Sequence, residues 1–89
     1  DVAAKAVKAP EKAKAKLTYA EQKELDGLLD SIDEAERAVK ALEASLADPT
    51  LYTSRGDEVP ALVAKLDVAR AEVARLSARW EALEEKQAG

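Results

Sequence analysis

The chain has 89 residues, of which 47% are hydrophobic and 36% charged, with a net charge of −4 and three aromatic side chains. This length suits one small domain, and the abundance of Ala, Glu, Lys, Leu and Arg is typical of a long helix or coiled coil. The absence of Cys and His excludes disulfides, thiol chemistry and the usual zinc ligands, so we expect a chain that is not an enzyme.

The first predicted element is a flexible Lys/Ala-rich linker, residues 1–16, which has little apolar surface to bury and is expected to be disordered. Its five lysines against two acidic residues give +3, whereas residues 17–89 carry nine basic and sixteen acidic residues, or −7. The segment also suits a polybasic arm that lies along nucleic-acid phosphates. Its candidate phosphate-binding residues are Lys5, Lys8, Lys12, Lys14 and Lys16.

A first helix is predicted over about residues 19–47, at the start of a C-terminal hairpin domain covering 17–89. Thr18 and Glu21 have the spacing of a capping box, which marks the helix start. Gly27 lies inside the helix and costs about 1 kcal/mol relative to alanine. Apolar residues recur in alternating steps of three and four, the period of a coiled-coil seam. They are Leu25, Leu28, Ile32, Ala35, Val39, Leu42 and Leu46.

A short helical turn over residues 49–52 should follow, because Asp48 suits an N-cap and Pro49 the first helical position. A loop over 53–56 then leads to Asp57, the expected N-cap of a second helix over about residues 58–86. This helix has the same apolar period, with Val59, Leu62, Leu66, Ala69, Val73, Leu76, Trp80 and Leu83. The connection is short enough to reverse the chain, so the sequence predicts an all-α, antiparallel two-helix coiled-coil hairpin.

Placing Leu46 opposite Leu62 sets a register for the two helices and brings large residues mostly against small or branched ones. On the edges, this register pairs Glu36 with Arg70 and Glu24 with Lys86. Exposed pairs of this kind select the alignment more than they stabilise it.

Two of the aromatic residues have an expected place in the hairpin. Trp80 could serve as a platform for base stacking, but its heptad position favours packing in the seam, against Leu25, Leu28 and Leu29. Tyr52 is expected to fold back onto the closed end of the hairpin.

Arg75 and Arg79 are a second candidate phosphate-binding pair, since arginines on adjacent helical turns are able to bridge phosphates. Glu72 lies within reach of Arg75, so a solvated face is the alternative. The three glycines are isolated, which excludes a glycine-rich phosphate loop. We therefore predict no catalytic residues, no metal site and no cofactor in this chain.

Three segments resemble the C-terminal domain of ABC-F ATPases of the Uup type. Residues 16–25, KLTYAEQKEL, are similar to that family's opening K-L-S-Y-x-E-Q-R-E-L. Residues 46–52, LADPTLY, are similar to L-x-D-P-x-L-Y, and residues 79–84, RWEALE, to R-W-x-E-L-E. The resemblance covers residues 16–86 and implies that the Lys/Ala-rich segment corresponds to the linker that precedes this domain.

The resemblance implies a DNA-binding module of an ATP-binding protein, with ATP and magnesium held by the ATPase domains of its own parent chain. A ribosome- or RNA-contacting or regulatory arm is the close alternative, and a plain helical spacer or self-association module is the third. No apolar stretch approaches the roughly 18 residues of a membrane span, so we expect no membrane contact and a cytoplasmic location. The charge of −7 on the hairpin opposes DNA binding unless the basic groups gather on one face.

Overall fold

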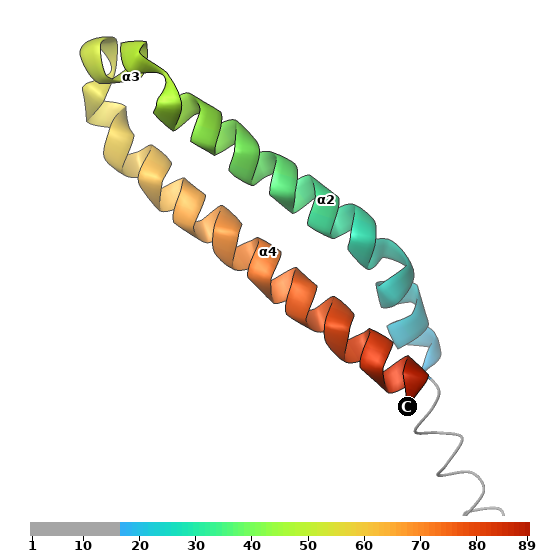
Figure 1. Cartoon of the computed structure of the whole chain (residues 1–89). Helices are drawn as coiled ribbons and strands as arrows, with labels where there is room; N and C mark the ends of the chain where they lie inside the picture. Colours follow the sequence, from blue (N-terminus) through green and yellow to red (C-terminus); the bar gives the residue numbers. More distant parts are fainter. Residues whose placement is uncertain (1–16) are drawn as a thin grey trace, which may run out of the picture.

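The computed structural model describes residues 17–89, which are all-α, as the sequence predicts. The elements are α2 (Tyr19–Ala47), α3 (Pro49–Ser54), the 3₁₀ helix η1 (Gly56–Glu58) and α4 (Val59–Ala88). Figure 1 shows α2 and α4 side by side and running in opposite directions, with α3 and η1 at the turn. We call this arrangement the hairpin, its turn the closed end and the opposite end the open end. The predicted linker, residues 1–16, lies outside the described residues.

The predicted capping box starts α2. The Glu21 backbone N–H donates to Thr18 Oγ1 at 3.0 Å, and the Thr18 N–H donates to Glu21 Oε1 at 3.0 Å. Two of the backbone donors that a helix N-terminus leaves without intrahelical partners are satisfied in this way.

Replacing Thr18 by alanine should therefore lower the free energy of unfolding by about 1 kcal/mol and fray the first turn of α2. Hydrogen exchange of the backbone amides of residues 19–22 measures this effect, and it should be faster in the variant. Amides on α4 serve as the internal control. Unchanged exchange across residues 19–22 would show that the side-chain cap does not hold the helix start.

A bend is visible in the N-terminal third of α2, the blue to teal part of the ribbon in Figure 1, although the helix is continuous through it. Gly27 lies in this third, and nothing stands within 4 Å of the position that a Cβ would occupy there. Since glycine is a common cause of helix bending, we attribute the bend to the loss of a side chain at this position.

The apolar seam of each helix faces the other helix. Every heptad residue named above is buried or half-buried, whereas most residues between them are exposed. Near the open end, Leu25 and Leu28 of α2 form a core with Leu76 and Leu83 of α4. Leu17, Ile32, Ala35 and Trp80 pack against this core. The 3.5-residue period thus identified the buried face correctly on both helices.

Trp80 packs against the open-end core, but it is half-buried rather than largely buried. Leu25 and Leu28 belong to this core, as expected, whereas Leu29 does not and is 59% exposed. A two-helix seam covers a large indole from one side only, which leaves the other side of the ring open to solvent.

The closed end is more ordered than the sequence predicts. Asp48 caps α3 by accepting a hydrogen bond from the Thr50 N–H at 3.0 Å, as expected, but α3 continues to Ser54 where a loop was predicted. The Leu51 side chain is fully buried, which the heptad pattern did not reveal. As predicted, Tyr52 folds back onto this end, and its hydroxyl donates to the carbonyl oxygen of Leu46.

The start of α4 also differs from the prediction. Asp57 is not its N-cap, because it belongs to η1, and Glu58 occupies the capping position without a side-chain hydrogen bond. The 3₁₀ turn explains the difference. The backbone N–H of Glu58 donates to the Arg55 carbonyl, so the chain enters α4 through backbone hydrogen bonds.

In place of each of the two predicted ion pairs along the edges of the hairpin, the structure has a pair whose partner lies one heptad away. Arg70 pairs with Glu43 rather than Glu36, and Glu24 pairs with Arg79 rather than Lys86. Lys86 instead binds Glu21 through both carboxylate oxygens, at 2.8 and 2.9 Å. An edge residue of one helix lies between two partners seven positions apart on the other helix. Long side chains reach either of them, so the seam alone does not decide the choice.

Candidate nucleic-acid interface

The predicted phosphate-binding residues fall into two groups. The five lysines of residues 1–16 lie outside the described residues. Arg75 and Arg79 lie one turn apart on α4, and both side chains remain partly accessible to solvent. The capacity of the hairpin to bind a phosphate therefore depends on the residues around these two arginines and on how charge is distributed over its surface.

Arg79 is bound to a carboxylate across the hairpin. Its Nε and one terminal nitrogen donate to the two carboxylate oxygens of Glu24, at 2.7 and 2.9 Å. This two-point contact holds the guanidinium against α2. The hydrogen bonds from Arg79 lower the pKa of Glu24, and the same bonds raise the pKa of Arg79.

Arg75 is bound to a carboxylate on its own helix. Its guanidinium donates twice to Glu72, at 3.0 and 2.7 Å. These hydrogen bonds lower the pKa of Glu72 and raise the pKa of Arg75. Each of the two arginines is thus partly neutralised by an adjacent carboxylate, which weakens its attraction for a phosphate.

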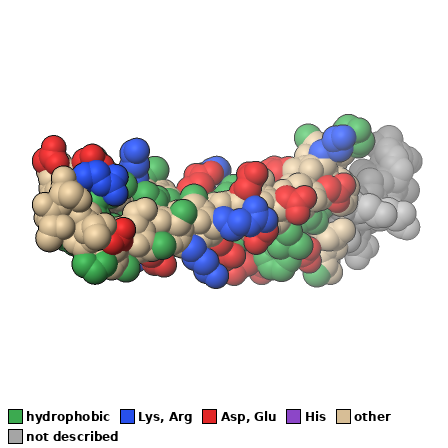
Figure 2. Space-filling view, turned by 90° about the horizontal axis from the view of Figure 1, so that it is seen from above, with side chains coloured by type: hydrophobic (Ala, Val, Ile, Leu, Met, Phe, Trp, Pro, Cys, Tyr) green, Lys and Arg blue, Asp and Glu red, His purple; other side chains and the backbone are tan. Residues whose placement is uncertain are grey.

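The other basic groups of the hairpin are also dispersed. Six of its nine basic side chains form ion pairs within the described residues; these are Arg37, Arg55, Arg70, Arg75, Arg79 and Lys86. Lys23 lies over the ring of Tyr19, with its ammonium 5.8 Å from the ring centre. Lys40 and Lys65 complete the set. On the face drawn in Figure 2, Lys and Arg side chains alternate with Asp and Glu along the hairpin.

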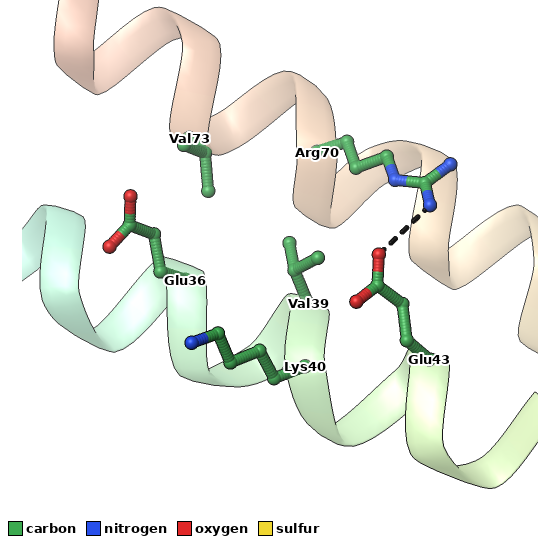
Figure 3. A pocket seen from close by; sticks show the side chains of 6 residues that line it. All are labelled: Glu36, Val39, Lys40, Glu43, Arg70 and Val73. Atoms are coloured by element: carbon green, nitrogen blue, oxygen red, sulfur yellow. Dashed lines mark hydrogen bonds and ion pairs between the residues drawn. The ribbon is translucent and has the colours of Figure 1, made fainter.

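A shallow groove crosses the middle of the hairpin between α2 and α4, with a volume of about 350 Å³. We call it the central groove. Val39 and Val73 point into it from the two helices, and charged side chains surround them, as Figure 3 shows. These charged residues are Glu36, Lys40, Glu43 and Arg70. With both signs of charge at its rim and an open apolar floor, the groove is a poor site for a phosphate.

Neither a metal centre nor a membrane span is found in the described part of the chain. Within residues 17–89, no group of three or more acidic side chains is placed to hold a metal ion. Over the same range, no helix has the length and apolar character needed to cross a bilayer.

Comparison with known proteins gives a family. The model of the ABC transporter C-terminal domain matches residues 16–85. Two Haemophilus influenzae proteins, "ATP-binding protein Uup-like" and "ATP-binding protein Uup", are each 38% identical to the chain over 72 residues. No solved structure matches the chain significantly.

These matches cover 81% of the chain but only 16% and 11% of the two relatives, so the chain corresponds to a small part of their length. The matched range agrees with the range of the sequence resemblance, residues 16–86. The identification as the C-terminal domain of a Uup-type ABC-F ATPase is confirmed, and this chain belongs to the ABC transporter C-terminal domain family.

Proposed function

We propose that this chain is a non-catalytic DNA-binding module of an ABC-F ATP-binding protein. In this proposal, an antiparallel coiled-coil hairpin carries the basic segment 1–16, which contacts the DNA backbone. ATP and magnesium are bound by other domains of the parent protein, because this chain has no glycine-rich phosphate loop.

The observation that carries the proposal is the separation of charge along the chain. The hairpin has a net charge of −7, and six of its nine basic groups are engaged with its own carboxylates. Such a surface repels a polyanion. Residues 1–16, at +3, are then the part of the chain suited to phosphate contact.

Contacts of this kind bind phosphates without reading the base sequence, because the lysines offer single charges rather than a set of base-edge donors on one helix. In this proposal, the arginines of the hairpin remain bound to its own carboxylates rather than to DNA. Leu17, the first described residue, packs against the core at the open end. Binding should therefore depend strongly on salt and weakly on DNA sequence.

The test is to replace all five lysines of residues 1–16 by glutamine and to measure duplex DNA binding over a range of salt concentrations. If each lysine neutralises one phosphate, the slope of log K against log salt should fall by about 4.5 units, at roughly 0.9 unit per contact. Fluorescence anisotropy of a labelled duplex measures both the affinity and the slope.

The matched control is the Arg75→Ala/Arg79→Ala variant, which should lower the slope by less than one unit because both arginines already have carboxylate partners. An unchanged slope in the glutamine variant would refute the role of the segment. A larger fall of the slope in the arginine variant than in the glutamine variant would indicate that the interface lies on α4. Tighter binding to a matched RNA duplex would favour the RNA-contacting alternative over DNA.

A further inference from the structure

One edge of the hairpin carries two exposed apolar side chains, Leu29 on α2 and Val63 on α4, which are 59% and 43% exposed. Leu29 precedes Glu36 by seven residues, and Val63 precedes Arg70 by seven residues. Seven residues are about two helical turns, so each apolar side chain lies on the same face as its charged residue, about 10 Å away. Glu36 and Arg70 both line the central groove. Leu29 and Val63 therefore lie on the groove's edge of the hairpin.

The antiparallel direction of the helices places these two residues on opposite sides of the groove. Leu29 lies toward the open end and Val63 toward the closed end, at the same number of residues from the groove. A second copy turned by 180° about an axis that crosses the hairpin at the groove would therefore place its Val63 against Leu29 and its Leu29 against Val63. A surface with that property suits a symmetric dimer, in which each residue of one copy meets a different residue of the other.

The charges at the groove suit the same rotation. Glu36 lies seven residues after Leu29, and Arg70 lies seven residues after Val63. The rotation that places Leu29 against Val63 of the second copy therefore also brings Glu36 toward Arg70 of that copy. Glu36 forms no ion pair with a described side chain, whereas Arg70 is held by Glu43. Opposite charges would then meet at the centre, with an apolar contact on each side.

We propose that this edge is the contact surface for a second copy of this chain. Two hairpins pack antiparallel about a twofold axis at the central groove, with Leu29 of each copy against Val63 of the other. The contact area is small, so the pair belongs to the weak class of interfaces, with a dissociation constant in the micromolar to millimolar range. The proposal does not depend on nucleic-acid binding.

Sedimentation equilibrium of the 89-residue chain at concentrations up to about 1 mM tests the association, given the affinity expected for a small interface. A concentration-dependent dimer is expected. The Leu29→Glu/Val63→Glu variant should stay monomeric, because it places charges in both apolar contacts. The control is Val68→Glu, since Val68 is 70% exposed and does not line the central groove. A monomer at all concentrations, or a dimer that survives the double substitution or is lost in the control, would overturn the proposal.

Disulfide cross-linking tests the antiparallel pairing itself. The chain has no cysteine, so single cysteines introduced by Leu29→Cys and Val63→Cys report on their own contacts. A mixture of the two single variants should form the mixed disulfide as its main product. Either variant alone should cross-link weakly, because its two cysteines would lie on the order of 20 Å apart in the dimer, beyond disulfide reach. Equal cross-linking in a mixture of Leu29→Cys with Val68→Cys would contradict the proposed geometry.

Discussion

Replacing Leu51 by alanine is expected to lower the free energy of unfolding by about 3 kcal/mol. The Leu51 side chain is 0% exposed, and its removal would leave a cavity at the closed end. A single seam of this size supplies only a few kcal/mol of stability in total. The variant should therefore lose most of its helix content near room temperature. Urea unfolding followed by far-ultraviolet circular dichroism measures the change.

The control for Leu51→Ala is Leu29→Ala, the same substitution at a leucine that is 59% exposed. Its effect should stay within about 0.5 kcal/mol, as for most surface substitutions. If both variants lose the same stability, Leu51 does not anchor the closed end.

Replacing Leu83 by alanine is expected to destabilise the open end by a similar amount, about 3 kcal/mol. Leu83 is 1% exposed and packs with Leu25, Leu28 and Leu76. For a domain of 60 to 100 residues, each kcal/mol corresponds to about 4–8 °C in Tm, so the variant should melt roughly 12 °C lower or more. Thermal unfolding followed by circular dichroism and by Trp80 fluorescence measures the shift.

Val68→Ala is the control for Leu83→Ala, because Val68 lies on the same helix and is 70% exposed. Its melting temperature should stay the same or rise slightly, since alanine has the higher helix propensity. A comparable fall in both variants would mean that burial at Leu83 does not hold the open end.

Much of the fold could be predicted because the relevant signals are local. The alternation of apolar residues in steps of three and four depends on helix geometry alone, and it selected the buried face of both helices. The caps at Thr18 and Asp48 follow from side chains that reach backbone donors two or three residues away. Such contacts form whatever the rest of the chain does, so the sequence indicates them directly.

The missed features depend on contacts between distant segments. Leu51 lies outside both heptad runs, and its burial arises only after α3 folds across the closed end. The turn motif L-x-D-P-x-L-Y was a signal, since it holds a leucine and a tyrosine at fixed positions after the proline. The pairing of Glu24 with Arg79 was likewise not predictable, because Arg79 and Lys86 are seven residues apart and share one heptad position.

The candidate interface was predictable only in part. The excess of lysines in residues 1–16 can be read directly from the sequence. Whether Arg75 and Arg79 are available to a phosphate depends on where neighbouring carboxylates point. Glu72 is near in sequence and was recognised, whereas Glu24 is 55 residues away and reaches Arg79 only across the folded hairpin.

The position of the first and last described residues has a mechanical consequence. Residues 17 and 89 both lie at the open end, where the ion pair between Glu21 and Lys86 ties the helices together. The closed end projects from there along α4, a helix of 30 residues and about 45 Å. A tilt of about 10° at the open end would carry the closed end through about 8 Å over that length. The length of the hairpin would thus amplify a small tilt at the open end into a much larger displacement at the closed end.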